Sequence, residues 1–175
     1  MDKLLELLEK LVRAIFGPGD EQDMGEPEPT PQAPKAEADK ELAVLRQALR
    51  GKELTMPVAV DMENAVLTAL KPKDLTNLAA YHLEQIEKMG FFAQLYTYTS
   101  YANRFLEMER LAGRWDIWLA DYTGKTPKVS FKYNAHQHSG EGSVPGITGN
   151  VDLNVTTLNY PRIIEKKGLT RLREA

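Results

Sequence analysis

The feature that most constrains the fold is an alternation of strand-like and helix-like segments that begins near residue 38. Helix patterns cover residues 39–50, 73–89 and 100–112, and a glycine follows each of them. The predicted strands are residues 56–62, 91–98, 117–122, 128–134 and 151–155. This alternation is typical of an α/β domain in which a parallel sheet is covered by helices.

The N-terminal part of the chain has a different character. Residues 2–16 repeat apolar side chains at spacings of three and four, which predicts an amphipathic helix within residues 1–16. Residues 17–37 are rich in Pro, Glu and Gly and are predicted to be a disordered linker. The α/β domain is expected over residues 38–168, with a tail at 169–175. Because the linker separates the first helix from the domain, we expect this helix to self-associate or to dock on a partner. Lying on a membrane surface is the weaker alternative, because acidic and basic residues are mixed on the polar face of the helix.

Composition excludes several classes of protein. The net charge of −3 and the pI near 5.7 argue against a nucleic-acid binder, and the absence of cysteine excludes disulfides and thiolate catalysis. No apolar run approaches the roughly 20 residues of a transmembrane helix. Charged residues interrupt the N-terminus, so no signal peptide is expected and the protein would be made in the cytoplasm. His136 and His138 lack a third ligand at matched spacing, so we expect neither a metal nor a cofactor.

Two acidic residues end the first predicted strand, in the sequence PVAVDMEN of residues 57–64. The apolar run predicts a strand buried on both faces, and alternation places Asp61 and Glu63 on one face, roughly 6–7 Å apart. Two carboxylates in unlike environments are what general acid–base cleavage of a glycosidic bond requires. A solvated Asp-x-Glu at a strand end is the alternative interpretation.

Other polar and aromatic residues fall near the ends of the later predicted strands. They are Tyr96, Tyr98, Asp121, Tyr122 and Asp152. In parallel α/β sheets, chemistry occurs at the carboxyl ends of the strands. This convergence favours a catalytic role for the pair Asp61 and Glu63.

Four segments, in order, resemble glycoside hydrolase family 25, the N,O-diacetylmuramidases. They are LRGKELTMPVAVDMEN, KMGFFAQLYTYTSYANRF, RWDIWLADY and HQHSGEGSVPGITGNVDLNV, and NYPRIIEKKGL is similar to the C-terminal segment of many members. The resemblance covers residues 38–168. It implies a lysozyme-type hydrolase of peptidoglycan glycan strands, cleaving the β-1,4 bond between N-acetylmuramic acid and N-acetylglucosamine. The protein would then act at a bacterial cell wall, released in a prophage-like or bacterial setting by something other than a signal peptide.

The resemblance also assigns roles to individual residues. Glu63 would be the general acid, and Asp61 its partner, which either steers the substrate's N-acetyl group or stabilises an oxocarbenium-like transition state. Asp152 matches a further acid of the site. The positions that line the sugar groove are Tyr96, Trp118, Tyr122 and Gln137.

The chain departs from the family at its N-terminal side. Family barrels open with a strand that bears another acid, usually as Gly-x-Asp-x-Ser, whereas nothing before residue 38 is typical of a strand. A full barrel takes about 200 residues or more. We therefore expect an incomplete TIM-like (β/α) barrel, its second half, with open edges at residues 58–61 and near Asp152 that favour self-association. The alternative function is an inactive remnant that binds glycan or only self-associates.

Overall fold

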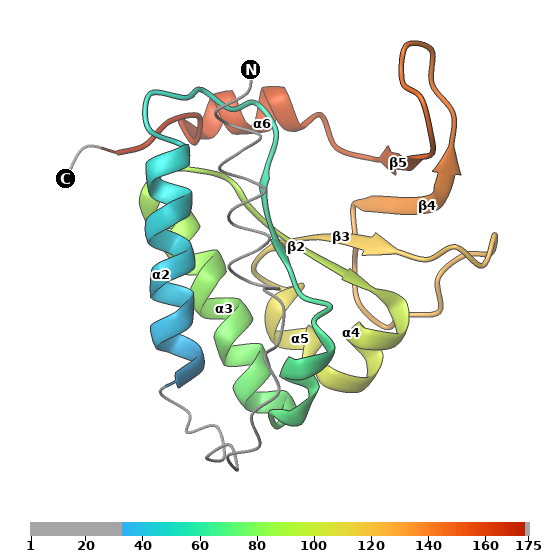
Figure 1. Ribbon diagram of the computed structural model, residues 1–175, viewed down its shortest axis with the longest axis horizontal. Coiled ribbons are helices and arrows are strands. Elements are labelled where there is room, and N and C mark those ends of the chain that lie inside the picture. The colour runs from blue at the N-terminus through green and yellow to red at the C-terminus, as the bar shows by residue number, and fades with distance from the viewer. Residues whose placement is uncertain (1–32, 174–175) are drawn as a thin grey trace, which may run out of the picture.

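The structure is a computed structural model that describes residues 33–173 (Figure 1). Its strands form one five-stranded sheet in the order β1-β2-β3-β4-β5. The strands are β1 (Val58–Asp61), β2 (Ala93–Tyr98), β3 (Asp116–Ala120), β4 (Ala135–Gly142) and β5 (Val151–Thr156). The helices are α2 (Ala33–Ala48), the 3₁₀ helix η1 (Ala65–Ala69), α3 (Pro72–Met89), α4 (Thr99–Phe105), α5 (Met108–Leu111) and α6 (Tyr160–Lys167).

The sheet is the curled part of an incomplete barrel, as expected from the sequence. Strands β1 to β4 are parallel neighbours, whereas β5 pairs with β4 in the antiparallel direction. The prediction of a purely parallel sheet is therefore wrong for the last strand. The eight-residue connection between β4 and β5 contains no helix and returns the chain as a hairpin, which forces the antiparallel direction.

Helices α2 and α3 lie next to each other on one side of the sheet, and α4 and α5 continue this layer (Figure 1). In α3, Pro72 occupies the first turn and Gly90 ends the helix in the left-handed conformation at φ 100°. The face that α3 buries is formed by Leu75, Thr76, Ala79, Leu83, Ile86 and Met89. This face packs on β1 and β2 and forms one hydrophobic core with their outward side chains.

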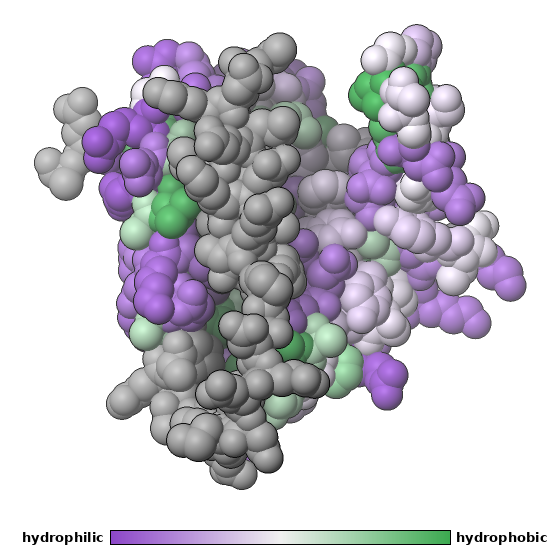
Figure 2. All heavy atoms as spheres, in the orientation of Figure 1, coloured by the Kyte–Doolittle hydropathy of each residue, from purple (hydrophilic) through white to green (hydrophobic). Residues whose placement is uncertain are grey.

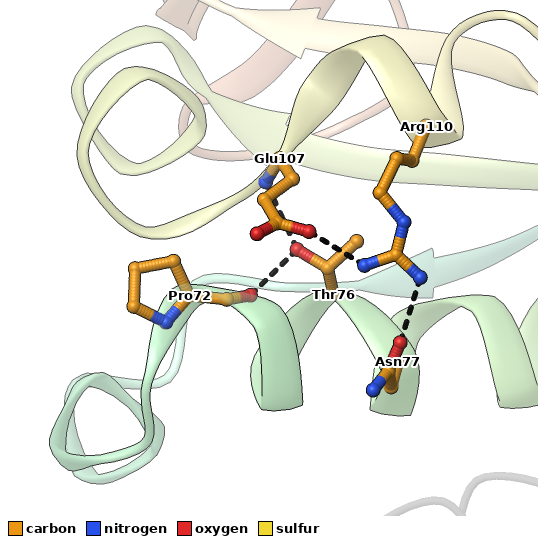
Figure 3. A network of polar contacts seen from close by, with 5 residues as sticks. All are labelled: Pro72, Thr76, Asn77, Glu107 and Arg110. Carbon is orange, nitrogen blue, oxygen red and sulfur yellow. Dashed lines mark hydrogen bonds and ion pairs between the residues drawn. The ribbon is translucent and has the colours of Figure 1, made fainter.

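The single helix predicted over residues 100–112 is wrong, because the chain breaks between α4 and α5. Leu106 is extended at φ −122° and ψ 142°. The buried hydroxyl of Thr76 accepts a hydrogen bond from the Glu107 N–H at 2.9 Å and donates to the Pro72 carbonyl at 2.7 Å (Figure 3). Arg110 then joins Glu107 to Asn77 on α3. The Glu107 N–H thus has a partner on α3 in place of a helical carbonyl, and this contact anchors the break.

The strand predicted over residues 128–134 is also wrong. Val129, Phe131 and Tyr133 do alternate with polar residues, and all three pack partly buried against the core. The segment nevertheless forms no ladder, and pairing with β3 begins only at Ala135. A loop that crosses the surface of the core can alternate apolar and polar residues just as a strand does. The alternation therefore correctly indicated which side chains are partly buried, but it did not indicate a strand.

Differences at the N-terminal side concern β1 and α2. Strand β1 is not buried on both faces: Val60 is buried towards the helices, while Ala59 and Asp61 are exposed on the concave face. Within residues 33–173, β1 pairs only with β2, so it is an edge strand. Helix α2 begins at Ala33, inside the segment 17–37 predicted as linker. The helix predicted over residues 2–16 lies outside the described residues.

A buried polar cluster closes the end of the sheet at which the strands begin. The Asp116 carboxylate accepts hydrogen bonds from Gln94 at 2.6 Å, from the Tyr160 hydroxyl at 2.5 Å and from Asn134 at 2.5 Å. Burial, together with the hydrogen bond to Asp116, raises the pKa of Tyr160, so its hydroxyl stays protonated and donates. Helix α6 thereby covers the base of the half-barrel and leaves the opposite end open.

The β4–β5 hairpin projects away from the helices (Figure 1). Ile147, in its connection, is 58 % exposed. Figure 2 shows hydrophobic side chains gathered at the outer end of this hairpin. Among residues 33–173, no helix is both long and apolar enough to cross a membrane.

Candidate active site

Strand register brings the predicted site residues together on the concave face. Asp61 on β1 lies beside Tyr96 on β2, which lies beside Trp118 on β3. One layer further towards the open end, Tyr98, Ala120, Gln137 and Asn154 are successive partners across β2 to β5. Since cross-strand partners share a face of the sheet, these side chains line one groove.

Glu63 is held in place by hydrogen bonds on both sides of it in the chain. The Met62 N–H donates to the Tyr96 carbonyl at 2.9 Å, and the Met62 carbonyl accepts from the buried Thr97 hydroxyl at 2.8 Å. The Asn64 carbonyl accepts from Tyr101 at 3.1 Å. Met62 is buried and Glu63 exposed, so the alternation of β1 continues past its last residue and presents Glu63 to the groove.

The environment of Asp61 differs from that of an ordinary surface carboxylate. Asp61 keeps solvent-accessible surface, but β2 and the end of β1 displace part of its hydration shell. This burial, and secondly the negative charge of Glu63, raise the pKa of Asp61 to about 6. The negative charge of Glu63 therefore acts on the Asp61 carboxyl on the same face of the chain.

A pocket of about 460 Å³ adjoins Glu63 at the carboxyl ends of β2 and β3. Its lining residues are Glu63, Tyr96, Tyr98, Thr99, Ser100, Ala120, Asp121, Tyr122 and Thr123. A volume of this order is typical of small-ligand sites. The lining combines tyrosine rings with short hydroxyl side chains, which suits a sugar with apolar ring faces and polar edges.

The aromatic wall of the groove is built from Tyr96, Trp118 and Tyr122. The rings of Tyr96 and Trp118 meet edge to face, with centroids 4.8 Å apart. The hydroxyls of Tyr96 and Tyr122 both donate to Oε1 of Gln137, which is only 3 % exposed. All four residues predicted to line the groove thus lie in one contiguous cluster.

Asp152 lies across the groove from β1, on the edge strand β5. A Cβ atom added at Gly140 would lie 3.4 Å from the Asp152 carboxylate and 3.5 Å from the Tyr122 ring, so both side chains pass over Gly140. Burial, followed by the charge of Asp152, raises the pKa of Tyr122. The structure therefore brings Asp61, Glu63 and Asp152 to the same groove.

Asn154 and Thr99 form hydrogen bonds with residues of the site but were not predicted from the sequence. Asn154 accepts a hydrogen bond from the Trp118 indole at 2.8 Å, and Thr99 donates to Asp121 at 2.7 Å. Burial opposes ionisation of Asp121, but hydrogen bonds from Thr123 and Thr99 lower its pKa overall. Asn154 is two residues after Asp152 in the same strand, so the two side chains are on the same face of the sheet. This spacing could have identified Asn154 as a site residue from the sequence.

The histidines of β4 have structural contacts. Nε2 of His136 lies 3.1 Å from the Asp121 carbonyl, and the His136 and His138 rings meet edge to face at 6.1 Å. Within residues 33–173, no group of three His, Cys, Asp or Glu side chains is placed to hold a metal ion.

Asp61→Asn is expected to stabilise the fold at pH 8 by about 1 kcal/mol, a value reduced for solvent screening of a partly exposed group. Because the folded-state pKa of Asp61 is raised, its favourable contribution is complete below pH 4 and is lost as pH rises through about 6. The gain should therefore disappear near pH 4 in thermal unfolding measurements. Asp121→Asn is the comparison variant, because the pKa of the Asp121 carboxyl is lowered in the folded protein. It should destabilise the fold at pH 8, and this effect should disappear in acid, where the carboxyl is protonated in the parent protein. A pH-independent gain for Asp61→Asn would contradict the argument.

Comparison with known proteins gives consistent matches. The pattern described as "Glycosyl hydrolases family 25" matches residues 29–147. Among solved structures, the CTP1L endolysin matches at a TM-score of 0.62 and 23% identity, over 75% of this chain and 45% of that one. The spore cortex lytic enzyme SleM of Clostridium perfringens matches at 0.57 and 21%, over 90% and 55%. A lysozyme of Streptomyces coelicolor matches at 0.60 and 16%, over 75% and 66%.

These matches define the extent of the shared fold. The chain spans about half the length of the first two solved structures and about two thirds of the lysozyme. At these identities, the structural likeness establishes a common fold. No curated protein sequence matches the chain significantly.

Proposed function

Because the chain belongs to the glycosyl hydrolases of family 25, we propose that it hydrolyses peptidoglycan glycan strands in the manner of a lysozyme. The bond cleaved is the β-1,4 linkage between N-acetylmuramic acid and N-acetylglucosamine. The observation that carries this proposal is the groove itself, in which Asp61 and Glu63 face an aromatic wall beside an open pocket. The similar structures are those of an endolysin, a spore cortex lytic enzyme and a lysozyme, which supports action at a cell wall.

In the proposed reaction, Glu63 donates its proton to the glycosidic oxygen as the bond to the anomeric carbon breaks. The carbonyl oxygen of the 2-acetamido group attacks that carbon, and Asp61 accepts a hydrogen bond from the acetamido N–H. Water then opens the cyclic intermediate while the Glu63 carboxylate takes its proton, so the acid is regenerated. Asp152 adds negative charge that favours the oxocarbenium-like transition state. Tyr96, Trp118, Tyr122 and Gln137 form the wall against which the sugars lie.

The test uses the full chain on purified peptidoglycan. We expect the turbidity of the suspension to fall and new reducing ends of N-acetylmuramic acid to appear. Reducing ends of N-acetylglucosamine would place the cleavage at the other linkage and contradict the assignment. Sedimentation of the protein with peptidoglycan, without new reducing ends, would instead identify a glycan-binding protein.

We further propose that a second copy of the chain pairs with β1. The N–H groups of Val58 and Met62 donate to β2, so those of Ala59 and Asp61 point to the other edge of β1, which has no partner strand among residues 33–173. Apolar surface flanks this edge, because Met56 and Val66 are 55 % and 79 % exposed. An exposed edge of this kind is a template for strand addition.

Light scattering after gel filtration should show dimers or larger species. Ala59→Pro removes an outward N–H without disturbing pairing to β2, so it should shift the protein towards the monomer, while Ala59→Ser should not. The competing route is through residues 1–16, outside the described part. Leu8→Glu tests that route, and dissociation by Leu8→Glu alone would overturn pairing at β1.

A further inference from the structure

Two amide side chains lie directly opposite each other in the β4–β5 hairpin. Gln137 on β4 is the register partner of Asn154 on β5. Gln137 is almost wholly buried, whereas Asn154 is exposed at the rim of the groove. Each amide is hydrogen-bonded to the aromatic wall, and within residues 33–173 no hydrogen bond joins either amide to Asp61 or Glu63.

Gln137 determines where two hydroxyl protons point. Its Oε1 accepts from Tyr96 at 2.9 Å and also from Tyr122. A carboxamide oxygen has two lone pairs, so both are used, and a phenol has only one proton to donate. Burial and nearby carboxylates raise the pKa values of both tyrosines, so both keep that proton. The phenol oxygens of Tyr96 and Tyr122 therefore offer only lone pairs to the groove.

Asn154 fixes the third aromatic side chain in the same way. Its Oδ1 accepts the indole N–H of Trp118 at 2.8 Å, and its Nδ2 donates to the Asp152 carbonyl at 3.3 Å. The indole is thereby held edge to face against the Tyr96 ring. Trp118 too has no free donor and presents only its ring to a ligand.

We propose that Gln137 and Asn154 are positioning residues that orient the aromatic wall, so that it binds sugars through ring faces and hydrogen-bond acceptors. This inference rests on the proposed function for its substrate class. It predicts that the sugar's acetamido N–H and hydroxyl protons are donated to Tyr96 and Tyr122. Gln137 thus acts through the two tyrosines, without a direct bond to the glycan.

If the Gln137 carboxamide had the opposite orientation, with Oε1 and Nε2 exchanged, a different result would be expected. Nε2 would then donate to both phenol oxygens, and both hydroxyl protons would be free to donate into the groove. The variants Gln137→Glu and Gln137→Leu separate the two cases, because a carboxylate only accepts hydrogen bonds and leucine neither accepts nor donates. His138→Leu, at an exposed position of the same strand, is the matched control.

Binding is measured by calorimetry with a β-1,4-linked tetramer of N-acetylglucosamine. We expect Gln137→Leu to weaken binding about tenfold, the effect of losing one or two net hydrogen bonds. Gln137→Glu keeps an acceptor for both hydroxyls and should lose less affinity than Gln137→Leu, whereas His138→Leu should stay within about threefold of the parent protein. Equal losses for Gln137→Glu and Gln137→Leu would overturn the proposal, and so would the absence of any loss.

A second readout does not depend on glycan. Near-ultraviolet circular dichroism arises from aromatic rings held in a fixed asymmetric arrangement, so Gln137→Leu should reduce it and Gln137→Glu should preserve it. Asn154→Leu should alter the Trp118 contribution, whereas Asn154→Asp keeps the acceptor and should restore it. If the parent protein neither binds nor cleaves glycan, the proposed function fails while these spectra still decide the positioning role. Unchanged spectra for Gln137→Leu and Asn154→Leu would overturn it.

Discussion

Glu63→Gln is expected to lower the rate of peptidoglycan cleavage by about a thousandfold or more, within the range for loss of a general acid. Glutamine has nearly the same shape as glutamate but has no acidic proton to give to the leaving oxygen. The backbone contacts on both sides of Glu63 involve Met62 and Asn64, so the substitution should leave the local fold unchanged. Release of N-acetylmuramic acid reducing ends from purified peptidoglycan measures the effect.

Two controls separate catalysis from binding and folding. Glu165→Gln makes the same chemical change at an exposed position of α6 and should keep full activity. Binding of the N-acetylglucosamine tetramer by Glu63→Gln should stay within about threefold of the parent protein, because the proton matters for bond cleavage. The same substitution removes the charge that helps raise the pKa of Asp61, so this pKa should fall. Retained cleavage in Glu63→Gln would exclude Glu63 as the acid.

Gly90→Ala is expected to destabilise the protein by about 4 kcal/mol, the sum of backbone strain and overpacking. Gly90 has φ 100°, a region that L side chains avoid. An added Cβ would overlap the Arg171 carbonyl and lie 2.9 Å from the Arg173 side chain, where the C-terminal segment crosses the end of α3. The clash with Arg171 involves backbone, which a side-chain rotation does not relieve. Thermal unfolding should occur about 10 °C lower or more.

Gly168→Ala is the matched control for this prediction. Gly168 also ends a helix in the left-handed conformation, at φ 63°, but no atom lies within 4 Å of its added Cβ. Only the strain remains, so a loss of about 1 kcal/mol is expected. Equal effects at the two glycines would show that the contact between Gly90 and residues 171–173 contributes nothing to stability.

The elements with strong local signals were predictable from the sequence. Helix α3 combines a proline start, a periodic apolar face and a glycine end, and it was predicted to within one residue. Strands β1, β2, β3 and β5 were found by their apolar or alternating patterns, although their ends were displaced by one or two residues. Asp61, Glu63, Tyr96, Tyr122 and Asp152 were identified because acids and tyrosines recur where these strands end, whereas Trp118 and Gln137 were identified through the resemblance to the family.

The errors arose where contacts distant in the sequence override local preference. Thr76, thirty-one residues away, contacts Glu107 at the break between α4 and α5. Val129, Phe131 and Tyr133 alternate as a strand would, yet whether a segment forms a strand depends on a neighbour with which to pair. The Thr76–Glu107 contact and the absence of a pairing strand both depend on distant residues, so a prediction from a short stretch of sequence could not have found either.

By itself, the sequence determined the α/β class, the approximate positions of α3, β1, β2, β3 and β5, and the acid pair Asp61 and Glu63. These follow from periodicity, from turn residues and from a motif, all of which act over a few neighbouring residues. Only the tertiary structure decided that β1 is an edge strand in the described residues, that Asp61 has a pKa near 6, and that Gln137 and Asn154 hold the aromatic wall. Each of these depends on contacts between residues that are distant in the sequence, which local patterns do not contain.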